Sequence, residues 1–151
     1  MDINHVKRPQ WCPSCAEGES EIICRGFFER IFNTKFPKAR LKWLMNPLTG
    51  GQMHFDGYCK ELKLVFEFNG PQHYRMYPKF HKSYQDFVRQ QERDKVKALL
   101  CQRHGVTLIT VPHTLEYDEF QEFIINEYTI LTGKKLKIIS KYDWRTFRKL
   151  N

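Results

Sequence analysis

The stretch from residue 54 to residue 74, HFDGYCKELKLVFEFNGPQHY, decides the fold. Its two apolar runs flank the polar segment CKELK, a pattern that predicts two antiparallel strands joined by a turn. The second run, KLVFEFNG, places Glu67 between two phenylalanines. A carboxylate in a buried strand is costly unless another group pairs with it or binds it. Glu67 therefore needs a partner.

The register of the hairpin predicts that partner. If the turn is centred between Glu61 and Leu62, Asp56 lies opposite Glu67 on the same face, with Cβ atoms about 5 Å apart. Two carboxylates this close repel unless one is protonated or a cation lies between them, so each would be uncompensated in the metal-free protein. A hard divalent ion such as Mg²⁺ suits the pair. The alternative is an exposed face with solvated carboxylates and a register shifted by one residue.

The composition indicates one globular domain with an acidic partner. The chain has 151 residues, of which 41% are hydrophobic and 15% aromatic, which is enough for a single domain with a real core. Its net charge of +8 favours nucleic acid as the partner, although an inert basic surface would carry the same charge.

The chain carries no sign of a membrane or secretory protein. No apolar run approaches about 18 residues, so no membrane span is expected, and the opening MDINHVKRPQWC lacks the apolar core of a signal peptide. Five cysteines, an odd number without secretory features, indicate a reducing compartment such as the cytoplasm or nucleus.

Apolar spacing predicts six elements in the order α-β-β-α-β-α, hence an α/β fold with a mixed central β-sheet flanked by helices. The apolar side of the second helix is predicted to consist of Phe87, Val96, Leu99 and Leu100, and this helix is predicted to end at Gly105. The predicted elements occupy residues 18–36, 54–59, 64–69, 83–105, 106–111 and 115–133.

Three segments organise the chain. Residues 1–17 are predicted to form an irregular N-terminal arm, residues 18–132 the folded domain, and residues 133–151 a basic C-terminal tail. In the arm, Cys12 and Cys15 have the spacing of half a zinc site, and a structural Zn²⁺ requires four ligands. His5 is the candidate for the third ligand, and Cys24 or Cys59 for the fourth.

The motif Asp56 … Glu67-Phe68-Asn69, the run EFNGPQHY and the later run ERDKVKALLCQRHGVTLITVP resemble the PD-(D/E)XK nuclease superfamily. They are most similar to its branch related to very-short-patch-repair (Vsr-like) endonucleases, whose hallmark is Glu-x-(Asp/Asn/Gln)-Gly-x-Gln-His. Within this branch, the sequence looks most like fungal and large-DNA-virus members in which the motif follows a WCPxC zinc-ribbon piece. The likeness spans Trp11 to Pro112. It implies a restriction-endonuclease-like core and a metal-dependent DNA endonuclease that hydrolyses phosphodiester bonds.

The resemblance also implies a metal site. Asp56 and Glu67 would bind Mg²⁺ or Mn²⁺, with the carbonyl of Phe68 as a further ligand. Glu21, on the first helix, would complete the site. Glu19 is the competing choice, because Gly-Glu-x-x-Ile of the relatives also fits residues 18–22, but an arginine one turn after Glu21 favours Glu21.

Other family positions would act on the substrate. Gln72 and His73 would orient the attacking water or a phosphate, and Asp94 and Lys97 match the family pattern on the later helix. His54, opposite Asn69, either touches the site or is only a polar strand residue. The residues expected to contact nucleic acid are Arg25, Tyr74, Lys95, Lys134, Lys135, Lys137, Lys141 and Arg145.

One position departs from the superfamily motif. Its lysine after the second acid is replaced by Asn69, and an amide cannot lower the pKa of a water by charge. Lys95 or Lys97 could supply the cation from the helix. The alternative function is a catalytically inactive nucleic-acid-binding module on the same scaffold.

Overall fold

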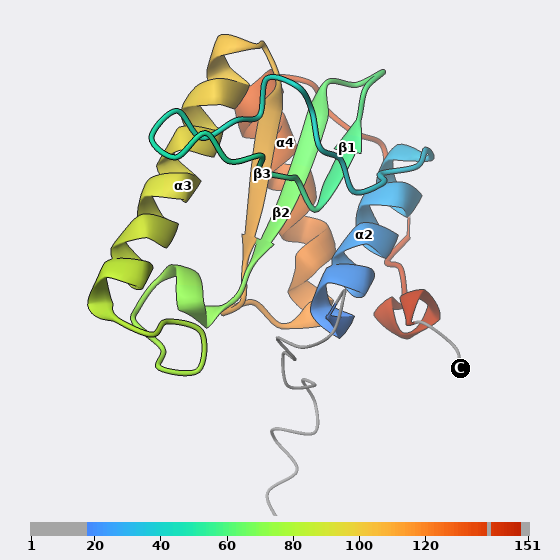
Figure 1. The fold of residues 1–151 in the computed structure, drawn as a ribbon. Helices are drawn as coiled ribbons and strands as arrows, with labels where there is room; N and C mark the ends of the chain where they lie inside the picture. Colours follow the sequence, from blue (N-terminus) through green and yellow to red (C-terminus); the bar gives the residue numbers. More distant parts are fainter. Residues whose placement is uncertain (1–17, 139, 149–151) are drawn as a thin grey trace, which may run out of the picture.

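The computed structural model describes residues 18–138 and 140–148, so the arm with His5, Cys12 and Cys15 lies outside the described residues. Helices and strands follow the predicted order α-β-β-α-β-α, with three short 3₁₀ helices in addition (Figure 1). The elements are α2 (Glu19–Phe32), β1 (Gly57–Cys59), β2 (Leu64–Asn69), η1 (Pro71–His73), α3 (Tyr84–Arg103), β3 (Thr107–Pro112), η2 (Tyr117–Glu119), α4 (Phe120–Thr132) and η3 (Trp144–Phe147).

The described strands form one mixed sheet in the order β1-β2-β3. Strand β1 pairs antiparallel with β2 in the predicted register, in which Gly57 lies opposite Phe66 and Cys59 opposite Leu64. Strands β2 and β3 run parallel. The expectation of an α/β fold with a mixed sheet is confirmed, and the segment from Gly70 to Val106, which contains η1 and α3, supplies the crossover between the parallel strands.

Strand β1 is shorter than the predicted 54–59. The backbone N–H of Asp56 donates to the Glu67 side chain, and that of Phe55 donates to the carbonyl of Ala39. Side-chain and loop acceptors therefore replace the β2 carbonyls as partners, which ends the ladder at Gly57.

Alternation along β2 separates two cores on the two faces of the sheet. Leu64, Phe66 and Phe68 belong to a large apolar cluster that α2 and α4 cover. Val65 faces a smaller cluster formed with the loop residues 41–55 and the C-terminal end of α3. The sheet therefore lies between α3 on one side and α2 and α4 on the other (Figure 1). Glu67 lies two residues after Val65 and so shares the α3 side.

Helix α2 begins with Glu19 and Glu21 in its first turn, where the helix dipole favours acidic groups, and ends at Asn33 in the left-handed conformation (φ 55°). Its buried side stacks Phe28 on Phe66 of β2, with ring centroids 4.7 Å apart. This contact fixes α2 beside the sheet and leaves Glu21 near the start of β1.

Helix α3 differs from its predicted burial pattern. Ser83 caps its start and Gly105 follows its end at φ 68°, as expected. Phe87 near the start and Cys101 near the end are buried, but Leu99 is 61% exposed, so its predicted place in the core is wrong. The middle of the helix turns polar side chains toward the sheet, because it covers a pocket instead of a core.

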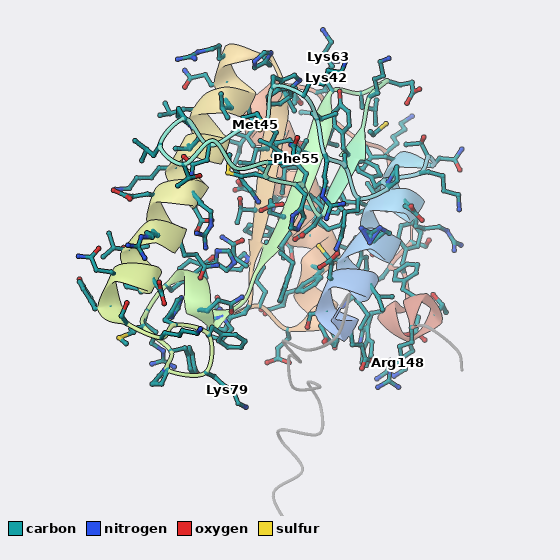
Figure 2. All side chains as sticks on the ribbon, in the orientation of Figure 1. Lys42, Met45, Phe55, Lys63, Lys79 and Arg148 are labelled. Carbon is teal, nitrogen blue, oxygen red and sulfur yellow. The ribbon has the colours of Figure 1, made fainter. Side chains whose placement is uncertain are left out.

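The chain after α4 packs back on the domain. Leu136, Ile138, Tyr142, Trp144 and Phe147 lie against the larger apolar cluster, and the ring of Phe147 is 4.9 Å from that of Phe27. Arg148 lies at the N-terminal end of α2, where its Nε donates to Glu19 Oε2 at 2.6 Å (Figure 2). None of the described helices is long and apolar enough to cross a membrane.

Candidate active site

A pocket of about 420 Å³ opens between the N-terminal end of α2, the start of β1, the end of β2, η1 and the middle of α3. These elements come from distant parts of the sequence, and α3 contributes the polar side chains of Gln90, Arg93, Asp94 and Lys97 to the lining. The pocket brings together seven residues predicted to act in catalysis or metal binding: Glu21, Asp56, Glu67, Phe68, Gln72, His73 and Lys97.

The carboxylates of Asp56 and Glu67 form the floor of the pocket. The N–H of Asp56 donates to Glu67 Oε2 at 2.9 Å, and the N–H of Phe68 donates to Asp56 Oδ2 at 2.8 Å. Each carboxylate is thus held by a backbone amide of the opposite strand, which fixes its rotamer. The predicted juxtaposition on one face is confirmed by these bonds and by the register.

Asp56 is the less compensated of the two acids. Burial, and after it the negative charge of Glu67, raises the pKa of Asp56 from 3.8 to about 7, although the Phe68 N–H and the Lys97 ammonium oppose the rise. A carboxyl with this pKa is a poor free anion and a good site for a cation, since a positive charge would offset both the cost of burying the carboxylate and its repulsion by Glu67.

Glu67 already has a cationic partner. Lys97 of α3 donates from Nζ to Glu67 Oε1 at 2.8 Å, and both side chains are nearly buried. The expectation that both acids are uncompensated in the metal-free protein is therefore wrong for Glu67. Of the two candidate lysines, the structure selects Lys97, because Lys95 is exposed on α3 and does not line the pocket. Lys97 brings to Glu67 the positive charge that Asn69 lacks.

Glu21 is the helix acid of the pocket. Its Oε2 lies 3.4 Å from Lys38 Nζ and 3.7 Å from Arg25 Nη2. The competing Glu19 lies on the other side of the first turn, paired with Arg148 and outside the pocket. The structure therefore places Glu21 in the pocket and Glu19 outside it, a choice that the sequence left open.

Gln72 presents an unsatisfied oxygen. Its side chain is 7% exposed and lines the pocket, and its Oε1 has no hydrogen-bond partner among the described residues. Gly70 makes room for it, because a Cβ at that position would lie 2.6 Å from Oε1. A buried amide oxygen without a donor is well suited to accept from a water or to bind a cation.

His73 forms a pair that the sequence did not indicate. Its Nδ1–H donates to Asp94 Oδ2 of α3 at 2.8 Å, which leaves Nε2 as the acceptor of the neutral ring. From the sequence, Asp94 is only a match to the family pattern and has no assigned role. A histidine in a 3₁₀ turn and an aspartate 21 residues later meet only after α3 has packed, so no local pattern could pair them.

Cations line the rim of the pocket. Lys38, from the loop after α2, and Arg93, on α3, were both missed because lone basic residues in a basic chain carry no signal. His54 also lines the pocket. Burial, and after it the charge of Lys97, lowers the pKa of His54, so a neutral ring is favoured there.

Other predicted contact residues lie apart from the pocket. Arg25 is largely buried and donates to the carbonyls of Phe36 and Asp56, with its guanidinium 5.5 Å from the Phe66 ring centroid. It therefore holds the strand that carries Asp56. Tyr74 is 48% exposed beside His113. The remaining predicted contact residues are exposed outside the pocket lining: Lys95, Lys134, Lys135, Lys137, Lys141 and Arg145.

The donors fit a divalent cation in part. Asp56 and Glu67 supply carboxylate oxygens, the ligands that Mg²⁺ prefers, and the raised pKa of Asp56 marks a negative charge without full compensation. Within residues 18–138 and 140–148, however, no cluster of three or more His, Cys, Asp or Glu side chains is close enough to hold a metal by itself. Water or phosphate oxygens would have to complete the coordination, as is usual for Mg²⁺.

The two cysteines considered as further zinc ligands are buried in the core. Cys24 and Cys59 are free thiols buried in the larger apolar cluster. Burial raises the pKa of Cys24 well above its ordinary value, which disfavours the thiolate that zinc binds.

Comparisons with known proteins give viral relatives. The chain is 41% identical over 102 residues to "Uncharacterized protein 094L" of Frog virus 3 (isolate Goorha), covering 67% of this chain and 66% of that protein. It is 37% identical over 108 residues to "Uncharacterized protein 033L" of Invertebrate iridescent virus 3, covering 72% and 56%. It is 39% identical over 115 residues to "Uncharacterized protein 307L" of Invertebrate iridescent virus 6, covering 66% and 58%.

The chain thus spans between about half and two thirds of the length of these curated relatives. No family model matches the sequence, and no solved structure matches it. The relatives' names describe no activity, so the function must be argued from the pocket.

Proposed function

We propose that this protein is a metal-dependent endonuclease that hydrolyses phosphodiester bonds in DNA, on a restriction-endonuclease-like core of the PD-(D/E)XK type. The observation that carries the proposal is the meeting of Asp56, Glu67 and Glu21 in one pocket beside Lys97. Bringing three acids from separate elements into one pocket costs folding free energy, because their charges repel. The cost is consistent with a site for a cation and a phosphate.

The ligands of the cation would be Asp56, Glu67 and the Phe68 carbonyl. Bound Mg²⁺ or Mn²⁺ supplies Lewis-acid polarisation of a phosphoryl oxygen and a water of lowered pKa. Lys97 would remain close enough to Glu67 to offset negative charge that develops on the phosphate.

The remaining pocket residues would handle the water and the nucleic acid. Gln72 Oε1 accepts a hydrogen bond from the attacking water, and His73, held through Nδ1 by Asp94, accepts its proton at Nε2. Lys38 and Arg93 on the rim bind the flanking phosphates. Acids at the floor and cations at the rim match a phosphodiester whose charge is shared between a metal ion and basic side chains.

The second candidate is a nucleic-acid-binding module without catalysis. It is favoured by the Lys97–Glu67 bond, which occupies one carboxylate oxygen, and by Asn69 in the place of the motif lysine. In this case Lys97 would compensate Glu67 permanently, and the pocket would bind phosphate without metal.

Cleavage assays separate the two functions. Supercoiled plasmid, nicked DNA, branched DNA and a structured RNA are each incubated with the protein in Mg²⁺, Mn²⁺ or EDTA. We expect metal-dependent cleavage of DNA that falls by at least about 100-fold in Asp56→Asn, while DNA binding in EDTA persists. Asp118→Asn, which removes an exposed carboxylate outside this pocket, is the matched control and should cleave as wild type.

Binding without cleavage in every metal would support the module instead. Cleavage that is unaffected by Asp56→Asn would reject the site. Cleavage of RNA alone would keep the chemistry and change the substrate.

A further inference from the structure

A second polar group lies behind His73, where the connector after η1 meets α3. Its centre is His81, a residue 3% exposed whose ring packs edge-on against Phe87 at 5.4 Å. Its Nδ1 lies 3.0 Å from the backbone nitrogen of Tyr77, and its Nε2 lies 2.9 Å from Oε1 of Gln90. Gln90 in turn approaches His73.

The backbone sets the direction of these hydrogen bonds. A peptide N–H can only donate, so Nδ1 of His81 must accept from Tyr77. A histidine that accepts at Nδ1 carries its proton at Nε2. His81 therefore donates to Gln90 Oε1, and the tautomer of a buried ring follows from one main-chain amide.

The same direction continues through Gln90. Because its oxygen accepts from His81, its NH₂ group faces His73. The amide nitrogen lies 3.2 Å from Nε2 and 3.5 Å from Nδ1 of that ring. Nearly equal distances to both nitrogens place the amide across the face of the ring and out of line with either in-plane lone pair. An N–H directed at the face of an aromatic ring is weakly attractive and holds the plane of the ring.

Asp94 completes the arrangement from the same helix. It lies one turn after Gln90 on α3, and its Oδ2 takes the Nδ1–H of His73 at 2.8 Å. Asp94 holds the Nδ1 edge of the His73 ring, and the Gln90 amide holds the plane of the ring. The Nε2 lone pair is therefore left for the pocket that His73 and Gln90 both line.

We propose that His81 and Gln90 are positioning residues for His73. The Tyr77 N–H fixes the tautomer of His81, and His81 in turn fixes the direction of the Gln90 amide. The Gln90 amide then holds His73 in the orientation in which it accepts a proton at Nε2. This inference rests on the proposed nuclease function for its catalytic consequence, but the direction of the hydrogen bonds stands independently of any activity.

Two variants of His81 separate positioning from simple stability. His81→Asn keeps an acceptor near Nδ1 for the Tyr77 N–H but is too short to reach Gln90. His81→Gln keeps a donor near Nε2 for Gln90 but loses the acceptor for Tyr77. We expect a crossed result: His81→Asn retains the melting temperature but loses about 10–100-fold in kcat at unchanged KM, whereas His81→Gln melts lower and keeps kcat within about 3-fold.

A merely structural role for His81 predicts that kcat follows the melting temperature in both variants, which would overturn the proposal. Gln91→Glu, a neighbouring change outside the group, is the control and should leave kcat and KM unchanged. Gln90→Leu should reproduce the kcat loss of His81→Asn, and normal kcat in a folded Gln90→Leu protein would also overturn it.

A spectroscopic test of the same proposal requires no substrate. Proton–nitrogen correlation spectra of the histidine rings should show His81 protonated at Nε2 alone and neutral His73 protonated at Nδ1. A nuclear Overhauser effect should connect the Gln90 side-chain NH₂ to the ring protons of His73, and His81→Asn should abolish it. The opposite tautomer of His81, or no such effect in the wild type, would reject the inference. If the wild type cleaves no nucleic acid, the proposed function fails, and these spectra still decide the direction of the hydrogen bonds.

Discussion

The Asp56 N–H donates to Glu67 Oε2 (2.9 Å), and the N–H of Phe68, the residue after Glu67, donates to Asp56 Oδ2 (2.8 Å). The pair is asymmetric in charge compensation, since Lys97 bonds to Glu67, and burial raises the pKa of Asp56 to about 7. The two acids should therefore respond in opposite ways to neutralisation.

Asp56→Asn should change how stability depends on pH in the metal-free protein. The folded state has the raised pKa, about 7 against 3.8, so it binds more protons than the unfolded state between about pH 4 and 7. The free energy of unfolding of the wild type should therefore fall as the pH rises through this window and stay low above it. At pH 8 the variant should be more stable, by on the order of 2–4 kcal/mol. Urea unfolding in EDTA at several pH values measures this, and parallel curves for the two proteins would contradict it.

Lys97→Met should destabilise the metal-free protein strongly. It leaves Glu67 nearly buried without its cation, which costs about 3–5 kcal/mol. For the same reason Glu67→Gln alone should be destabilising, whereas two acids that only repelled each other would predict equal or greater stability for this variant. The double variant should recover part of the loss in a double-mutant cycle. Lys95→Met, on the exposed side of the same helix, is the control and should stay within about 0.5 kcal/mol of wild type. Additive single effects would contradict the pairing.

Lys38→Ala and Arg93→Ala should each weaken DNA binding in a salt-dependent manner. If each side chain contacts one phosphate, each substitution should reduce the slope of log K against log [salt] by about 1. Titrations of labelled duplex in EDTA at several salt concentrations give the slope. Lys60→Ala, in the exposed β1–β2 turn, should leave the slope unchanged. Equal slopes in all three variants would remove the pocket rim from the interface.

Gly57→Ala should damage stability and site together. An added Cβ would overlap the Phe66 ring and lie 2.9 Å from the carbonyl oxygen of Phe36, so the strand next to Asp56 must shift. Overpacking of this kind costs about 1–3 kcal/mol. Thermal melts and DNA cleavage should both be impaired, whereas Gly51→Ala, which meets only the side-chain oxygen of Thr49, should be tolerated. A stable and fully active Gly57→Ala protein would show that this close contact does not position Asp56.

The sequence by itself determined the hairpin register, the mixed sheet and the facing of Asp56 and Glu67. These features follow from local rules, because a short turn sets the register and strand alternation sets the face. The order of helices and strands followed from hydrophobic periodicity for the same reason. Leu99 is the instructive error: Lys97, which lines the pocket, and Cys101, which is buried, each lie two residues away and face inward, so Leu99 lies on the opposite side of α3 and is 61% exposed.

Only the tertiary structure decided which distant side chains meet. Glu21 and not Glu19 enters the pocket because the docking of α2 against Phe66 sets the rotation of that helix, while the C-terminal segment brings Arg148 to Glu19. Lys97 reaches Glu67, and Asp94 reaches His73, because α3 crosses the sheet at one particular angle and depth. Pairings between elements depend on packing that no single stretch of sequence encodes, since each helix face is compatible with several partners until the core fixes its orientation.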